Sequence, residues 1–299
     1  MGWRIINIED AARLNYKLNC IGIYINDEYY WINFDEIDTI VISDLRCNIS
    51  IRLIKELMEN GINVIICGLN HMPIGTMLPF QNNSRSSKYN QLQISWKQET
   101  KQKLWQLIVK AKIALQIEVL LALNKNNRIE LLCQNLNDVE LGDITNREGH
   151  AAKVYFHELF GKAFNRQDES IINSCLNYIY QIIRSKISQV IVSHGYLPSV
   201  GIFHCNEYNY FNLADDLIEV FRPICDLYVF RLLKETESKF LTPEFKLKLS
   251  AILIEQVKIK NSKQEIKEAI RIYVNSVLDA LTDGVFEEIF FPQIITNEK

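Results

Sequence analysis

The chain has 299 residues, of which 48% are hydrophobic and 23% are charged, and its formal net charge is −3 at pH 7. This length allows one large or two moderate domains with a substantial core, and the composition excludes a disordered chain. No apolar run is long enough to span a bilayer, and residues 1–14 lack the apolar segment of a signal peptide, so we expect a cytoplasmic protein with no membrane partner.

The first eighty residues are expected to form mostly β-strands. β-branched and aromatic residues gather in short runs that polar pairs such as Asn-Asp and Asp-Glu separate. The predicted strands are residues 20–25, 29–34, 37–42, 63–68 and 72–78. One helix interrupts them, capped by Asn48 and ended by Gly61. Its apolar stripe consists of Ile51, Ile54, Leu57 and Met58. We therefore predict a small β-rich N-terminal domain over residues 1–80.

The chain changes character after residue 80. Residues 81–93 are polar and show no apolar periodicity, which indicates a linker. A helix is predicted over residues 94–124, with lysines on the face opposite its apolar stripe. That stripe consists of Trp96, Leu104, Leu107, Ile108, Ala111, Leu115 and Val119. Further helices follow, the last over residues 262–283. We predict an all-α domain over residues 94–299, and a multi-domain α+β protein as a whole.

Positive charge is concentrated in one segment. Residues 1–80 carry 6 Lys/Arg and 10 Asp/Glu, a net of −4, whereas residues 81–135 carry 9 Lys/Arg and 3 Glu, a net of +6. Clustered positive charge attracts a phosphate backbone whatever the total charge of the protein. A solvated helix face accounts for the same lysines about as well, so both interpretations stay open at this point.

The seven cysteines are scattered, odd in number and never spaced as CxxC. That pattern is typical of reduced thiols in a cytoplasm and argues against both a disulfide framework and a zinc ribbon.

A glutamate lies at a predicted helix start near residue 147. Residues 143–146 supply capping side chains, and Glu148 falls in the first turn. The small residues Gly149, Ala151 and Ala152 allow another element to approach closely, so this carboxylate can face a partner helix. Taken alone, Glu148 is an acid favoured by the helix dipole.

Residues 195–223 place His204 in a polar loop ahead of a second helix start. Asn212 can cap this helix, and Asp215, three residues on, completes a capping box. The apolar stripe of the helix consists of Leu213, Leu217, Val220, Phe221 and Ile224. Taken alone, His204 is a hydrogen-bonded loop histidine.

Three acids share one face of this helix. Glu219 follows Asp215 by four residues and Asp216 by three, so the side chains of the three acids are held close together. Such acids repel one another unless a cation lies among them. A divalent metal ion would supply that charge.

Two segments carry a resemblance to a known family. GYLPSVGIFHCNEYNYFNLADDLIEVFRP, residues 195–223, resembles the C-terminal signature of the CRISPR-associated protein one family, in the short form found with type II systems. REGHAAKVYFHELFGKAFNR, residues 147–166, resembles the glutamate motif of the same family. Phe203, Ile179 and Val220 depart from the family pattern, which commonly has histidine, glycine and proline there. The resemblance covers nearly the whole chain.

The resemblance implies a metal-dependent DNA endonuclease and integrase of CRISPR spacer acquisition. The family's three metal ligands match Glu148, His204 and Glu219, a donor set that suits Mg²⁺ or Mn²⁺. Asp216 would support a ligand or help the nucleophile. The 3′-OH of a captured duplex would attack the repeat backbone directly, and water in its place would give nuclease activity. Arg85, Lys88 and Arg147 are the candidate DNA contacts.

The resemblance also implies partners. These are double-stranded DNA (the captured protospacer and the CRISPR repeat), a second copy of the chain bound through the N-terminal β domain, and a small second adaptation protein. An effector nuclease and an end-binding adaptation protein would join them in type II-like systems.

Two other functions fit the same residues. A metal-dependent repair nuclease acting on branched or single-stranded DNA would use every site residue named above. A non-catalytic DNA-end-binding scaffold would keep the basic segment but would not need Glu219.

Overall fold

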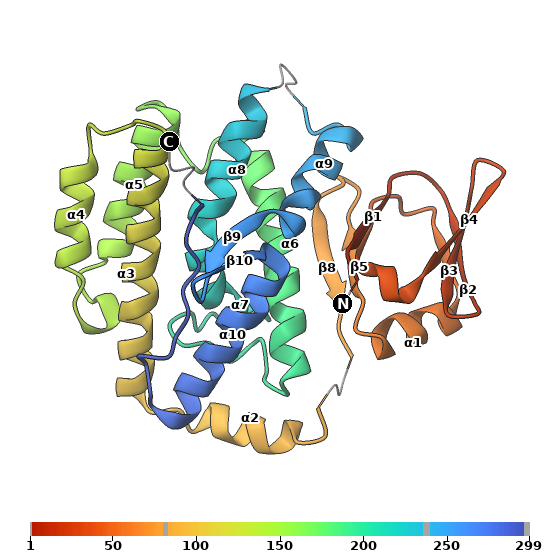
Figure 1. Cartoon of the computed structure of the whole chain (residues 1–299), viewed down its shortest axis with the longest axis horizontal. Coiled ribbons are helices and arrows are strands. Elements are labelled where there is room, and N and C mark those ends of the chain that lie inside the picture. Colours follow the sequence, from red (N-terminus) through yellow and green to blue (C-terminus); the bar gives the residue numbers. More distant parts are fainter. Residues whose placement is uncertain (1, 80–82, 236–239, 296–299) are drawn as a thin grey trace.

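The computed structural model describes residues 2–79, 83–235 and 240–295, and shows a strand-rich part followed by a helical part (Figure 1). The strands are β1 (Arg4–Ile8), β2 (Arg13–Lys17), β3 (Cys20–Ile25), β4 (Glu28–Asn33), β5 (Ile37–Ile42), β6 (Asn48–Ile49), β7 (Asn63–Cys67), β8 (Pro73–Met77), β9 (Gln256–Ile259) and β10 (Ser262–Glu265). The helices are α1 (Ile51–Glu59), α2 (Ser86–Ile94), α3 (Gln98–Ala122), α4 (Ile129–Asn137), α5 (Arg147–Phe160), α6 (Ile171–Ser193), α7 (Asn212–Leu217), α8 (Arg222–Lys234), α9 (Pro243–Ser250) and α10 (Ile266–Asp283). The α+β fold class is confirmed.

Two four-stranded sheets make up the strand-rich part. Their strand orders are β1-β5-β7-β8 and β4-β3-β2-β6. In the second sheet, β2, β3 and β4 form an antiparallel meander. Asn26 and Asp27 make the turn between β3 and β4 with positive φ angles, a conformation that Asn and Asp tolerate better than most residues. The predicted strands over residues 20–25 and 37–42 are confirmed to the residue.

The first sheet is buried on both faces. Ile40 of β5 and Val64 of β7 face a core shared with the second sheet and α1. Val41 and Ile65, their neighbours in sequence, face the core formed by the helices. Successive side chains of a strand point to opposite faces, so one sheet contributes to both cores. The strand-rich part is therefore continuous with the helical part through this sheet.

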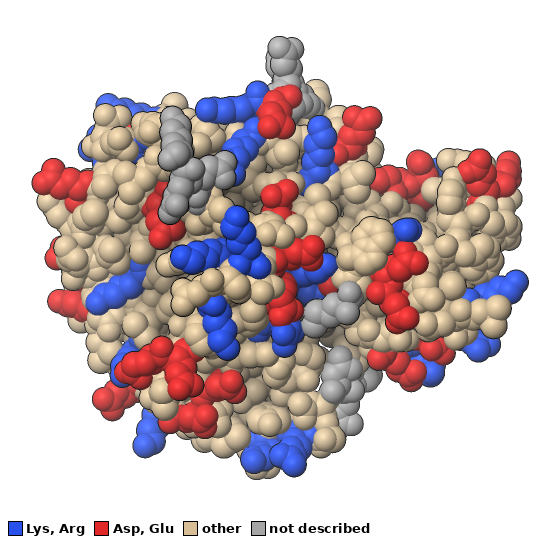
Figure 2. All heavy atoms as spheres, in the orientation of Figure 1, with Lys and Arg blue, Asp and Glu red and all other residues tan. Residues whose placement is uncertain are grey.

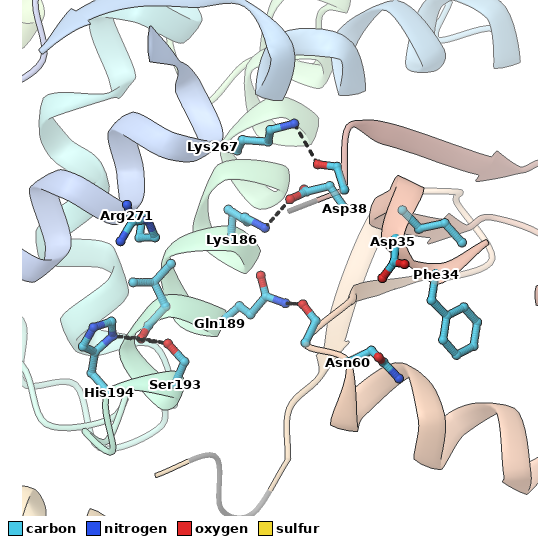
Figure 3. Close-up of a pocket in the computed structure, with 14 residues that line it drawn as sticks. Phe34, Asp35, Asp38, Asn60, Lys186, Gln189, Ser193, His194, Lys267 and Arg271 are labelled. Atoms are coloured by element: carbon cyan, nitrogen blue, oxygen red, sulfur yellow. Dashed lines mark hydrogen bonds and ion pairs between the residues drawn. The ribbon is translucent and has the colours of Figure 1, made fainter. Parts of the chain in front are cut away.

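Polar side chains connect the first sheet to α6 and α10 around a cavity of about 570 Å³ (Figure 3). Lys186 of α6 forms a buried ion pair with Asp38 of β5 at 2.8 Å. Gln189 Nε2 donates to the Gly61 carbonyl at 2.6 Å, and Lys267 Nζ donates to the carbonyl of Gly2 at 3.0 Å. Directional bonds of this kind fix how the sheet lies on the helices.

The predicted cap of the first helix is wrong. Ser50, not Asn48, accepts a hydrogen bond from the Leu53 N–H. Asn48 instead pairs with Arg13 in the short strand β6, so the chain is still extended there. Ile51, predicted on the buried stripe, is 80% exposed.

The predicted linker over residues 81–93 is also wrong for most of its length, because residues 86–94 form α2; residues 81 and 82 lie outside the described residues. Gln93, which is buried, donates to the carbonyls of Leu197 and Val200 and accepts from the Leu197 N–H, each at 2.8 Å. Because α2 is attached through the polar side chain of Gln93, its sequence has no apolar stripe from which the helix could be predicted.

Among its described residues, the C-terminal part contains one hairpin besides its helices and loops, so the all-α prediction is wrong at that point. β9 and β10 pair in antiparallel fashion across a turn in which Lys260 and Asn261 have positive φ. The last helix accordingly starts at Ile266 rather than at residue 262. Within the described part of the chain, no helix combines the length and apolar character needed to cross a membrane.

Candidate active site

The site forms where α5 and the chain around residue 219 pack against α3. Lys112 on α3 is buried, and its Nζ donates to Glu148 Oε1 and to Glu219 Oε2. Burial alone would lower the pKa of Lys112, but the two carboxylates outweigh it and raise the pKa. Glu148 and Glu219 therefore meet at one point, and a cationic side chain lies between them.

The chain before α5 orients Glu148. Asn146, in the left-handed conformation, caps the helix by accepting from the Gly149 N–H at 3.3 Å. The buried Asp143 carboxylate accepts from the N–H groups of Arg147 and Glu148 at 2.8 and 3.0 Å. These bonds satisfy the first free donors of the helix and fix the backbone that carries Glu148.

Glu219 lies on the 3₁₀ turn Ile218–Val220 between α7 and α8. Its second oxygen, Oε1, accepts from Arg222 Nε at 2.8 Å. Burial raises the pKa of this carboxyl, but the charges of Arg222 and Lys112 outweigh that effect and hold the pKa at about 2. Glu219 is therefore a buried, ionised carboxylate held from two sides.

His204 is held by Asp216. The fully buried carboxylate of Asp216 accepts from His204 Nδ1 at 2.7 Å and from the backbone N–H groups of Phe203 and His204 at 3.2 and 3.0 Å. The hydrogen bond to Asp216 raises the pKa of the imidazole more than burial lowers it. Trp105 of α3 stacks on Phe203 at 4.3 Å and meets His204 edge-on.

The loop that carries His204 is closed by Asn212. Its amide donates to the carbonyls of Ser199 and Asn206 at 3.1 and 3.0 Å, and its oxygen accepts from the Asn206 N–H at 3.2 Å. The predicted helix cap at Asn212 is wrong: this residue lies inside α7 and makes no cap bond. Its side chain is used to hold the loop instead.

The three acids of the 212–224 helix do not converge. Asp215 accepts a hydrogen bond from Asn209 Nδ2 at 2.7 Å and forms an ion pair with Arg184 at 3.5 Å. Asp216 instead binds the loop that carries His204. Each acid has its own donor or cation, so protein side chains supply the compensating charge that we expected from a metal ion alone.

The donor set fits a divalent ion in chemistry and in charge. Among the described residues, no three His, Cys, Asp or Glu side chains surround one point closely enough to hold a metal as they stand. Lys112 nevertheless marks a position between two carboxylates where a cation is held. His204 Nε2 makes no hydrogen bond within the described chain. Two carboxylates and an imidazole nitrogen suit Mg²⁺ or Mn²⁺.

The candidate DNA contacts lie on two elements. Lys88 on α2 and Arg85, the residue just before this helix, are both exposed. Gln93 attaches α2 to the loop leading to His204. Figure 2 shows Lys and Arg atoms along the lower edge of the molecule, over α2. Arg147, which adjoins Glu148 in the sequence, forms an ion pair with Asp138 at 3.6 Å.

Two residues of the site, Lys112 and Arg222, were not found from the sequence. Lys112 was expected on the solvent face with the other lysines, although it follows Ile108 by four residues on the apolar stripe, and that spacing was the available signal. Arg222 precedes a proline at the start of α8. That proline indicates where a helix begins, but nothing in the local sequence indicates that Arg222 pairs with Glu219.

Fold and site together define an α+β protein whose helical part presents paired glutamates and a carboxylate-supported histidine beside exposed cations. The model of the family described as "CRISPR associated protein Cas1" matches residues 5–268. A "CRISPR-associated endonuclease Cas1" from Neisseria meningitidis serogroup C (strain 8013) is 33% identical over 99% of this chain and 97% of its own length. The chain belongs to the Cas1 family.

Solved structures share the fold. A "Casposase bound to integration product" matches with a TM-score of 0.78 at 22% identity, over 96% of this chain and 92% of that one. A "Cas6-RT-Cas1--Cas2 complex" matches with a TM-score of 0.76 at 16% identity, over 100% of this chain and 36% of that one.

Proposed function

We propose that this Cas1 protein is a metal-dependent DNA integrase of CRISPR adaptation. It joins the 3′-OH ends of a captured duplex to the CRISPR repeat and acts as an endonuclease when water is the nucleophile. The Neisseria relative, named as an endonuclease, and the casposase bound to its integration product support this class of activity. The observation that carries the proposal is the convergence of Glu148 and Glu219 on one cation position, beside a histidine fixed by Asp216.

The reaction is a single transesterification. The 3′-OH of the captured strand loses its proton as its oxygen forms a bond to the phosphorus of the repeat strand. The bond from that phosphorus to the repeat's own 3′ oxygen breaks, and the departing oxygen takes up a proton and leaves as a 3′-OH. A divalent ion, when bound by Glu148, His204 and Glu219, supplies positive charge at the attacked phosphate.

The chain's own residues prepare the site for that reaction. Arg222 holds Glu219 in its ionised form, and the bond between Asp216 and His204 Nδ1 leaves Nε2 as the ring nitrogen available to a ligand. Asp216 thus acts through His204, as a positioning residue.

The test is strand joining by purified protein with its small partner, a protospacer duplex, a repeat-bearing plasmid and Mn²⁺. Glu219→Gln keeps the shape of the side chain but removes the charge, so joining should fall to background while duplex binding is retained. Glu207→Gln, an exposed acid in the His204 loop, is the matched control and should join normally. Joining by Glu219→Gln at the wild-type rate under saturating Mn²⁺ would contradict the proposal, and absence of joining by wild type would favour a DNA-end-binding scaffold.

The DNA partner would lie along α2. Arg85 and Lys88 are exposed there and have no carboxylate partner among the described residues, so both charges are free for phosphates. Arg147 would contact DNA next to Glu148.

A second copy of the chain would bind at β4. This strand is the edge of its sheet and leaves one row of backbone groups unpaired. It also exposes three consecutive aromatic residues, Tyr29, Tyr30 and Trp31, at 59%, 48% and 45%. An edge strand of this kind is typical of a pairing surface.

A small second adaptation protein would be a further partner. The similarity to the "Cas6-RT-Cas1--Cas2 complex", whose name couples Cas1 with Cas2, supports it. An effector nuclease and an end-binding protein would complete the assembly.

A further inference from the structure

Lys112 is a buried cation with two anionic partners, one from each of the elements that form the site. Its side chain is 7% exposed, and it bridges Glu148 on α5 and Glu219 just before α8. Without Lys112, the two carboxylates would face each other, and Arg222 would contact Glu219 at its far oxygen, away from Glu148. The ammonium therefore holds the two ligand-bearing elements together.

A divalent ion bound by the same two carboxylates would need the place that the ammonium occupies. Two cations cannot share that place, because their mutual repulsion in a buried site exceeds what two carboxylates compensate. The ammonium must therefore move when an ion binds.

Gln116 provides a place for it to go. It lies one turn after Lys112 on α3, and residues four apart share a helix face. The side chain is 1% exposed, and its Oε1 is buried without a hydrogen-bond partner among the described residues. An unsatisfied buried carbonyl is costly, and a Lys ammonium is a donor that can satisfy it.

We infer that Lys112 is a movable counter-ion: it holds Glu148 and Glu219 together without metal, and transfers to Gln116 Oε1 when a divalent ion enters. This inference rests on the metal site of the proposed function. It makes ion binding a competition with an internal cation, so the affinity of the site for metal is set partly by a residue that is not a ligand.

The first experiment measures Mn²⁺ binding by calorimetry and thermal unfolding, without DNA. Lys112→Met keeps the length of the side chain and removes the competitor, so it should tighten Mn²⁺ binding about tenfold or more. The same variant should unfold at a lower temperature than wild type in EDTA, and should gain more than wild type from saturating Mn²⁺. Lys110→Met, on the same helix, is the matched control and should leave both quantities unchanged. A weaker or unchanged Mn²⁺ affinity in Lys112→Met overturns the inference.

The second experiment tests the transfer. Gln116→Leu removes the acceptor, so the displaced ammonium loses its partner and Mn²⁺ binding should weaken severalfold, opposite in sign to Lys112→Met. An unchanged affinity overturns the role of Gln116.

Crystal structures of the wild type with EDTA and with Mg²⁺ give a readout that does not depend on the folding of Lys112→Met in EDTA. Lys112 Nζ should contact both carboxylates in the first structure and neither in the second. Contact with both in the presence of a bound ion overturns the inference.

The metal site and the counter-ion role fail in different ways. If wild type binds no Mn²⁺, or binds it equally well after Glu148→Gln, the metal site itself is wrong. If wild type binds Mn²⁺ through Glu148 but Lys112→Met does not bind it more tightly, only the counter-ion role is wrong.

Discussion

Asp216 Oδ1 lies 2.7 Å from His204 Nδ1, and the same carboxylate accepts three backbone N–H groups from the loop that carries the histidine. One buried side chain therefore orients both the imidazole ring and the main chain that supports it. A carboxylate can accept all of these bonds because both of its oxygens are acceptors.

Asp216→Asn tests this support. An amide has one acceptor oxygen, so its NH₂ group must face backbone donors. Strand joining should fall about 10- to 100-fold, the usual effect of losing a group that orients a metal ligand. Since Asp216 raises the pKa of His204, the variant should shift that pKa back toward its ordinary value of 6.5, which imidazole NMR titration measures. Asp215→Asn is the control; an equal shift there would contradict the assignment.

Replacing Gly201 by any residue with a Cβ atom should destabilise the fold. A Cβ atom at this position would lie 2.2 Å from the His204 carbonyl oxygen and 2.8 Å from Asp216 Oδ2. Gly201→Ala should therefore lower the free energy of unfolding by about 1–3 kcal/mol, because the loop must move away from its anchor. Gly75→Ala, where no atom lies within 4 Å of the added carbon, is the control for denaturant unfolding and should be far milder.

Asp226 should make the protein less stable as pH rises. Burial raises its pKa to about 6 from an ordinary 3.8, and the bond from Tyr180 and the charge of Arg222 offset this only in part. The folded state therefore holds the proton more tightly than the unfolded state, so this contribution is present below pH 3.8 and is lost as pH rises through about 6. Asp226→Asn still accepts from Tyr180, and it should be more stable than wild type by about 2–3 kcal/mol at pH 8.

Denaturant unfolding at pH 4 and pH 8 measures this difference. The advantage of Asp226→Asn should be small at pH 4 and present at pH 8. Asp279→Asn, an exposed site on α10, should show no such pH dependence. A loss of stability in Asp226→Asn at pH 8 would contradict the raised pKa of Asp226 and mean that its charge is needed.

Duplex binding should depend on α2 and on salt. Replacing Arg85 and Lys88 with glutamate should weaken binding to all sequences alike and reduce the salt slope by about two, one for each lost phosphate contact. Fluorescence anisotropy over a salt series measures both quantities. Lys263→Glu, on the exposed side of β10, should leave them unchanged. If the salt dependence of duplex binding is the same in wild type and in every variant, α2 does not contact DNA and is only a solvated surface.

The exposed aromatic residues of β4 should control self-association. Replacing Tyr29 and Trp31 with serine removes apolar area from the edge strand, so sedimentation should shift toward the monomer. Leu69→Ser is the control, since this residue is 89% exposed but lies away from β4, in the turn between β7 and β8. A dimer that is unaffected by the β4 changes would place the interface elsewhere.

Local sequence determined the strands, most helices and the motif residues. Turn residues that tolerate positive φ separated the strands, as at Asn26 and Asp27, and residues 143–146 indicated the start of α5. These features act within a few residues, so they can be recognised without the rest of the fold. The motifs at Glu148, His204 and Glu219 were recognised in the same way, by order and context.

Tertiary structure alone decided what those residues touch. Lys112 binds Glu148 and Glu219, which are 36 and 107 residues further along the chain. Gln93 donates a hydrogen bond to Val200, 107 residues further on. Periodicity tells which face of a helix is buried but not which side chains from other elements meet it. A lysine on an apolar stripe becomes stable only when distant carboxylates compensate its charge. The packing of α5 and α8 against α3 therefore decided that Lys112 lies between the two glutamates.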